Sequence, residues 1–202
     1  MNYEILVNKD NPIDLNYLKN TIIPLLVSIE FTRDNDDLFN EFGITDKKIY
    51  LEKETALAWN ELKTFLIVKG IQFDICSGYL SLEQQQNKYN NFLKRNGILM
   101  TKNRISVPGY SEHHTGLAID CDYYKDGDWA GICDDSNDET QYIHSILHKF
   151  GFILRYPKHK QEITKMQYEP WHIRYVGVDL ANKLYLEDLT LEEYYLIKKK
   201  NI

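Results

Sequence analysis

The spacing of apolar residues predicts a chain that combines helices with short strands. Residues 52–69 carry apolar side chains at every third or fourth position, and a glycine follows as a C-terminal cap, so they predict a helix. Residues 71–76 alternate between apolar and polar side chains, which is typical of a strand. Ser81 and Gln84 then form a capping box that opens a second helix, which we expect to end near Gly97.

The second half of the chain continues this mixture. We expect strands at 117–124, 152–156 and 171–176, and helices at 139–150 and from Thr190 onward. Strands and helices do not alternate regularly, so the pattern favours an α+β fold with a mostly antiparallel central sheet flanked by helices.

The first fifty residues are harder to interpret. Residues 3–7 predict a short strand, and residues 18–31 are strongly apolar but contain Pro24, which divides them into a short helix and a strand at 25–29. Residues 32–46 are rich in Asp and Asn and predict a surface loop with at most one helical turn. Because no linker or repeat divides the 202 residues, we expect a single domain over 1–202.

Charge and hydropathy exclude some partners and favour a compartment. The chain has 24 Lys and Arg against 30 Asp and Glu, a net charge of −6, and its basic residues form no long stripe before the last lysines. Binding to nucleic acid or to an anionic membrane is therefore disfavoured. No export signal or long apolar run is evident, and the three cysteines, Cys76, Cys121 and Cys133, lack a C-x-x-C spacing. These features predict a cytoplasmic protein, whereas the oligomeric state is left open.

Two short segments carry the candidate chemistry. The first, residues 111–120, contains His113 and Asp120, and the second, residues 169–172, contains Glu169 and His172. A hydrolytic zinc site needs three protein ligands, an open position and an unligated carboxylate that serves as general base. The two histidines and Asp120 can supply the ligands, and Glu169 the base.

The local sequence gives this site partial support. Gly116 lets the chain turn between His113 and the strand that bears Asp120, so that both side chains can reach one point. Pro170 interrupts the regular strand ladder, so Glu169 need not face away from His172. Histidines beside carboxylates are also common on protein surfaces. The residues alone therefore leave two interpretations open, a zinc site or ordinary surface side chains.

The order S-x-H-x-x-G-x-A-x-D and then E-P-W-H resembles the zinc D,D-peptidases of bacterial cell-wall metabolism, the D-alanyl-D-alanine carboxypeptidases and dipeptidases of vancomycin resistance, and most of all their VanXY branch. The resemblance covers about residues 48–195. It implies the hedgehog-like zinc fold of that family and hydrolysis of small peptides that end in D-Ala or D-Ser.

The resemblance also implies roles for single residues. It assigns one Zn²⁺ to His113, Asp120 and His172, and it assigns the role of general base to Glu169. Ser111 and Gln85 match positions near the substrate, while His114 is not expected to be a ligand.

One position departs from the family pattern. Leu80 stands where the family usually has an arginine that donates to the carbonyl oxygen as it becomes negative. Removing such a donor commonly costs about 10²–10³ in rate, so the alternative is a zinc-binding relative with weak or altered activity. Arg104 is the first candidate to replace the donor.

Three further side chains keep two interpretations each. Trp171 is a packing anchor beside the metal or a platform for the substrate. Arg155 and Arg174 bind a substrate carboxylate or take part in structural ion pairs.

Overall fold

The computed structural model describes residues 1–202 except 33, 126–127, 130–136 and 201–202. Cys133 lies outside the described residues, and neither Cys76 nor Cys121 is in a disulfide bond. None of the helices in the described ranges is long and apolar enough to cross a membrane.

A five-stranded antiparallel sheet lies at the centre of the described structure, with strand order β3-β4-β7-β6 and β5 attached to β4. Its strands are β3 (Phe73–Ser77), β4 (Ala118–Lys125), β5 (Asp128–Trp129), β6 (Phe152–Leu154) and β7 (His172–Tyr175). A second, two-stranded sheet joins β1 (Leu26–Ile29) to β2 (Ile49–Glu52), also antiparallel. The predicted α+β class with a mostly antiparallel sheet is thereby confirmed.

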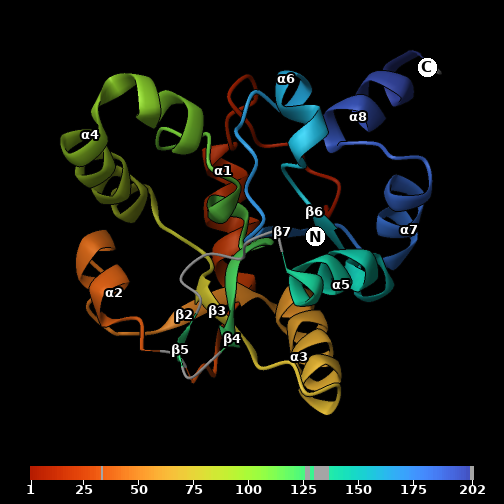
Figure 1. Ribbon diagram of the computed structural model, residues 1–202. Helices are drawn as coiled ribbons and strands as arrows, with labels where there is room; N and C mark the ends of the chain where they lie inside the picture. Colours follow the sequence, from red (N-terminus) through yellow and green to blue (C-terminus); the bar gives the residue numbers. More distant parts are fainter. Residues whose placement is uncertain (33, 126–127, 130–136, 201–202) are drawn as a thin grey trace.

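Helices flank the central sheet on two sides (Figure 1). One group comprises α3 (Lys53–Val68), α5 (Asp138–Ile146), α7 (Val178–Leu186) and α8 (Leu191–Lys200), and the other comprises α2 (Asp36–Phe42) and α4 (Leu82–Arg104). The remaining helical turns are short: α1 (Leu15–Tyr17), η1 (Leu18–Ile22), η2 (Ile23–Leu25), η3 (Glu112–Thr115), η4 (Leu147–Phe150), η5 (Lys158–Lys160) and α6 (Gln161–Thr164).

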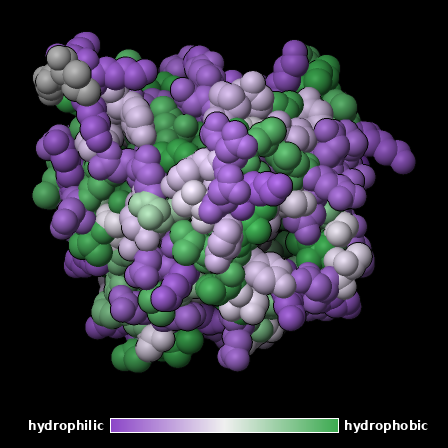
Figure 2. Space-filling view, turned by 180° about the vertical axis from the view of Figure 1, so that it is seen from behind, coloured by the Kyte–Doolittle hydropathy of each residue, from purple (hydrophilic) through white to green (hydrophobic). Residues whose placement is uncertain are grey.

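The main core forms where α3 packs on the sheet. Trp59 and Leu62 of α3 are fully buried, and the Trp59 ring lies 5.2 Å from that of Phe73 on β3. This is the apolar face that the helical spacing of residues 52–69 predicts, and burying it is the main driving force for docking the helix. On the face of the molecule seen in Figure 2, hydrophilic and hydrophobic side chains are intermixed.

Two expectations for local structure are wrong, and each has a physical cause. Residues 3–7 form no strand, because the carbonyl oxygens of Tyr3 and Ile5 accept hydrogen bonds from the buried Arg174 side chain and not from a neighbouring strand. Residues 32–46 contain the two-turn helix α2, because Phe39 and Phe42 are buried.

The second predicted helix is interrupted at Gly97, where the sequence leads us to expect its end. Gly97, at φ 75° and ψ 169°, forms a kink, and a further helical stretch follows it, so that α4 comprises two stretches up to Arg104. Helix α7 was not predicted. It closes a small apolar cluster around Leu184 and Ala181, which only the folded arrangement brings against Ile153 of β6.

Gly116 makes the turn that the sequence predicts between η3 and β4. Its φ is +67°, and a Cβ atom there would lie 2.8 Å from Leu26 Cδ2 and 2.9 Å from the Glu52 backbone nitrogen. That nitrogen donates a hydrogen bond to the Gly116 carbonyl oxygen. Both the positive φ and the close approach of the two-stranded sheet therefore require glycine at position 116.

We expect Gly116→Ala to lower the free energy of unfolding by about 3 kcal/mol, because it adds steric crowding to an unfavourable φ. Gly70→Ala is the matched control, since Gly70 has φ +80° but nothing within 4 Å of an added Cβ, and it should cost only about 1 kcal/mol. Urea denaturation measures both variants, and equal losses would show that the contact with Glu52 is unimportant.

Candidate active site

The sheet brings three potential metal ligands to one point. His113 lies on η3, Asp120 on β4 and His172 at the start of β7, and one ligand atom from each lies within 4.8 Å of the others. The register between β4 and β7 places Asp120 directly opposite His172. Asp120 Oδ1 lies 2.9 Å from His172 Nδ1, and its Oδ2 lies 3.2 Å from His113 Nε2.

The second nitrogen of each ring, which does not face Asp120, lies near an oxygen atom. His113 Nδ1 lies 2.7 Å from the Gly78 carbonyl oxygen, to which it donates, so that Nε2 is left as an electron-pair donor toward Asp120. His172 Nε2 points away from Asp120 toward Glu112 Oε2, 3.6 Å away. Two imidazoles and one carboxylate, with the His113 ring oriented through its other nitrogen, match the ligand set of a hydrolytic zinc site.

His114 does not take part in this group. Its Nδ1 lies 2.7 Å from the Leu80 carbonyl oxygen, and its Nε2 accepts a hydrogen bond from the Gly109 backbone nitrogen. Both ring nitrogens are used in holding the loop.

Glu169 lies beside the three ligands. Its side chain is 7% exposed, and Oε2 lies 3.8 Å from His172 Nδ1. Burial raises the pKa of Glu169 to about 7, although the nearby positive charges of His172, Lys88 and Arg104 act in the opposite direction. A carboxyl group with a pKa near neutrality can both accept and release a proton at physiological pH, as a general base must.

The charges around the ligands shift their pKa values in different directions. Burial lowers the pKa of His113. Burial would also lower that of His172, but its hydrogen bond to Asp120 and the nearby carboxylates of Glu112 and Glu169 raise its pKa to about 9. Burial would raise the pKa of Asp120, whereas His113 and Lys88 hold it well below its ordinary value. Asp120 is therefore a carboxylate throughout the physiological range.

Behind His172 lies a buried ion-pair cluster. Glu112 Oε1 accepts from Arg155 Nε at 2.8 Å and from Arg174 Nη1 at 2.7 Å, and all three side chains are at most 1% exposed. Burial alone would raise the pKa of Glu112, but the two arginines hold it far below its ordinary value. Arg155 also pairs with Glu192 of α8. Of the two interpretations for these arginines, the structural ion pair describes the contacts seen.

A cleft of about 330 Å³ opens onto the ligand group. Ser111, Gln85, Arg104 and Trp171, the four residues that the sequence suggests for substrate contact, all line it. Trp171 also packs against the main core, so its two interpretations are compatible. Buried polar atoms of Ser77 and Gln85 lack hydrogen-bond partners among the described residues, which suits a cleft that binds a polar ligand.

Two features of the cleft differ from expectation. Leu80 is fully buried and does not line the cleft, and its backbone nitrogen donates to the His113 carbonyl oxygen. Lys88, which the sequence reasoning did not single out, lines the cleft and approaches Asp120. Its position three residues after Gln85 on the same helix is the signal that could have identified it.

Comparisons with known proteins agree with this geometry. The VanY family of D-alanyl-D-alanine carboxypeptidases matches residues 48–178. The bifunctional D-Ala-D-Ala dipeptidase and carboxypeptidase VanXYC of Enterococcus gallinarum is 36% identical over 200 residues, which cover 96% of this chain and 94% of the relative. A D-alanyl-D-alanine carboxypeptidase of Enterococcus faecium is 33% identical over 201 residues, and the chain spans 59% of its length.

Solved structures show the same fold. The LD-carboxypeptidase LdcB matches with a TM-score of 0.75 and 33% identity, covering 94% of this chain and 84% of that one. The vancomycin-resistance D,D-pentapeptidase VanY, solved as a variant in complex with Zn(II), matches with a TM-score of 0.72 and 29% identity, covering 96% of this chain and 99% of that one.

We expect Glu112→Gln to lower the free energy of unfolding by about 3–5 kcal/mol, because it leaves Arg174 buried without a counter-charge and removes one of the two carboxylates that pair with Arg155. Asp10→Asn is a suitable control, since Asp10 pairs with Lys165 at 2.6 Å but both side chains are more than half exposed, and it should cost less than about 1 kcal/mol. Urea denaturation at neutral pH measures both. A cost for Glu112→Gln no larger than the control's would contradict the role of the cluster.

Glu169 should destabilise the protein above neutral pH. Because burial raises its pKa from 4.5 to about 7, the unfolded chain releases this proton first, and stability falls as pH rises from about 4.5 to 7. In protein freed of divalent metal by a chelator, Glu169→Gln should add about 2–3 kcal/mol at pH 8 and almost nothing at pH 4. Urea denaturation at both pH values tests this, with the exposed Glu162→Gln as control. An equal effect of Glu169→Gln at both would be inconsistent with the raised pKa.

Proposed function

The chain belongs to the VanY family of D-alanyl-D-alanine carboxypeptidases and is a peptidase, and we propose that it hydrolyses the terminal peptide bond of small peptides that end in D-Ala-D-Ala. The observation that carries this proposal is the convergence of His113, Asp120 and His172 beside the buried Glu169 in one cleft. The named relatives are peptidases, which does not favour the alternative of a binding protein with little catalysis.

In this proposal His113, Asp120 and His172 hold one Zn²⁺, the ion in the related VanY structure. Zinc in a three-ligand site supplies Lewis acidity, which polarises a carbonyl group and makes water reactive near neutral pH. The sheet register and the partners of the two imidazoles would hold the ligands in place before the metal arrives.

Glu169 would move the proton in this reaction. Its carboxylate accepts a proton from the attacking water as the C–O bond forms, and it delivers the proton to the amine nitrogen as the C–N bond breaks. Burial favours this exchange, because it raises the pKa of Glu169 above that of an exposed glutamate, to about 7 in the metal-free chain, and makes its carboxylate a stronger base.

We propose that Ser111, Gln85, Arg104 and Trp171 contact the peptide, because each lines the cleft. The cleft volume of about 330 Å³ suits a ligand of a few residues. A terminal D-Ser differs from D-Ala by one hydroxyl group, and both remain candidates for the final residue. Three further parts of the proposal rest on the sequence alone. They are a use in glycopeptide resistance, a cytoplasmic location and a single domain over residues 1–202.

A second candidate is an L,D-carboxypeptidase, which would remove D-Ala from a peptide that ends in an L-residue followed by D-Ala. The observation in its favour is that LdcB, described as an LD-carboxypeptidase, matches this chain as well as the D,D-peptidase does. The two candidates share the metal centre and the base. They differ only in the configuration, D or L, of the residue that precedes the cleaved bond.

We expect the zinc-loaded chain to release D-Ala from D-Ala-D-Ala or from a pentapeptide that ends in D-Ala-D-Ala, as mass spectrometry would show. The panel should also contain D-Ala-D-Ser and a tetrapeptide that ends in an L-residue and D-Ala. Cleavage of the tetrapeptide alone would favour the L,D candidate, and no cleavage of any peptide would exclude the proposal.

Glu169→Ala should retain zinc, measured by elemental analysis, and lose hydrolysis by at least about 10³-fold. Loss of zinc from that variant would instead show that Glu169 is a ligand.

A further inference from the structure

The cleft contains a cation to which the reaction described above assigns no task. Lys88 lies on the face of α4 that also carries Gln85 and Phe92, and the three side chains line the cleft together. Their spacing of three and then four residues places them on one helix face. Lys88 is therefore positioned by regular helix that begins at the capping box of Ser81, and not by a loop.

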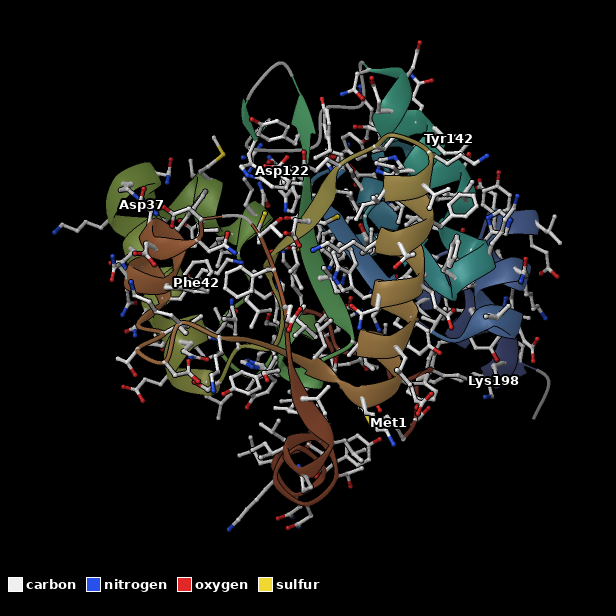
Figure 3. All side chains as sticks on the ribbon, turned by 90° about the horizontal axis from the view of Figure 1, so that it is seen from below. Met1, Asp37, Phe42, Asp122, Tyr142 and Lys198 are labelled. Carbon is white, nitrogen blue, oxygen red and sulfur yellow. The ribbon has the colours of Figure 1, made fainter. Side chains whose placement is uncertain are left out.

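The contacts of Lys88 place its charge at the ligand group. Its Nζ lies 3.3 Å from Asp120 Oδ2 and 5.0 Å from the centre of the Phe42 ring, and its side chain is only 16% exposed. Figure 3 shows Phe42 at the end of α2, on the side of the molecule where α2 and α4 lie. Among the described residues Asp120 is its hydrogen-bond partner, so the ammonium group, which has three N–H donors, retains two for another acceptor.

A purely structural ion pair does not explain this arrangement well. Asp120 already lies within 3.2 Å of both imidazoles, and in the proposed enzyme it also binds a divalent cation. A cation in that position repels the ammonium group and competes with it for the carboxylate. Because lysine has a flexible four-carbon stem, its ammonium group can turn to a different acceptor within the cleft.

The other cation of the cleft is less suited to this task. The Nε atom of Arg104 donates to Gln167 Oε1 at 2.8 Å, which holds the guanidinium group at the end of α4. No contact between Arg104 and a proposed metal ligand is found among the described residues, whereas Lys88 touches Asp120 directly. Arg104 remains suited to the terminal carboxylate of a peptide, as a fixed planar donor.

We propose that Lys88 donates a hydrogen bond to the carbonyl oxygen of the scissile peptide bond as that oxygen becomes negative, an inference that rests on the proposed function. The oxygen of water bonds to the carbonyl carbon, the C–N bond breaks, and Glu169 carries the proton to the leaving nitrogen, while Lys88 makes and breaks no covalent bond. Leu80 stands where the family usually has an arginine that donates to this oxygen. Lys88 would supply the missing donor from α4.

Lys88→Met tests this role, because it keeps the length of the side chain and removes its charge. On the peptide that the wild type cleaves best, kcat should fall by about 10²–10³-fold while KM changes by less than about threefold. Binding of a phosphinate analogue of D-Ala-D-Ala, which carries the charged tetrahedral oxygen, should weaken by a similar factor in calorimetry. Binding of the uncleaved peptide should not change when Lys88→Met is added to the inactive Glu169→Ala variant.

Two controls separate charge from structure. Lys94→Met changes an exposed lysine of the same helix and should leave every readout unchanged. Lys88→Arg keeps the charge and should recover kcat to within about tenfold of wild type.

Three results would overturn the inference about Lys88. These are an unchanged kcat and analogue affinity in Lys88→Met, equal weakening of the analogue and the uncleaved peptide, or loss of zinc from a folded Lys88→Met. A wild-type chain that neither cleaves any peptide of the panel nor binds the analogue would instead exclude the proposed function itself.

Discussion

The pairing of Asp120 on β4 with His172 on β7 is the contact on which the candidate site depends. Strand register alone places them opposite each other, and η3 adds His113 from the turn before β4. A one-residue slip between β4 and β7 would turn one of the two side chains to the other face of the sheet, so the packing that fixes the register also fixes the site. The main core against α3 and the turn at Gly116 therefore bear on chemistry as well as on stability.

Charges are organised around this contact in two layers. Toward the cleft, Asp120 faces two imidazoles and Lys88, and burial makes Glu169 a weaker acid than an exposed glutamate. On the other side, Glu112 is neutralised by Arg155 and Arg174 and faces the second nitrogen of His172. The outer layer places a carboxylate opposite the second nitrogen of His172, and in the proposed reaction the inner layer supplies the proton carrier and a cation for the anionic oxygen.

Much of this arrangement could be predicted from the sequence, and the failures have identifiable reasons. The helix at 52–69, the capping box at Ser81 and the strand that bears Asp120 depend on local spacing and were recognised from it. Helix α7 and the role of residues 3–7 depend on partners distant in the sequence, such as Arg174, and no local pattern reveals them. The four central site residues could be named because two motifs occur in a recognisable order. Lys88 was missed because a lone lysine on a predicted helix is usually solvent-exposed.

The contact between Arg155 and Glu192 joins the proposed metal centre to the last helix of the described chain. Arg155 bonds to Glu112 on one side and to Glu192 of α8 on the other, and Glu112 in turn faces His172. A change far along the chain, such as a shortened C-terminus or a fusion that displaces α8, therefore has a direct electrostatic route to a histidine about twenty residues earlier. Preparations of this protein that differ only at their C-terminal end are thus not interchangeable for measuring metal affinity.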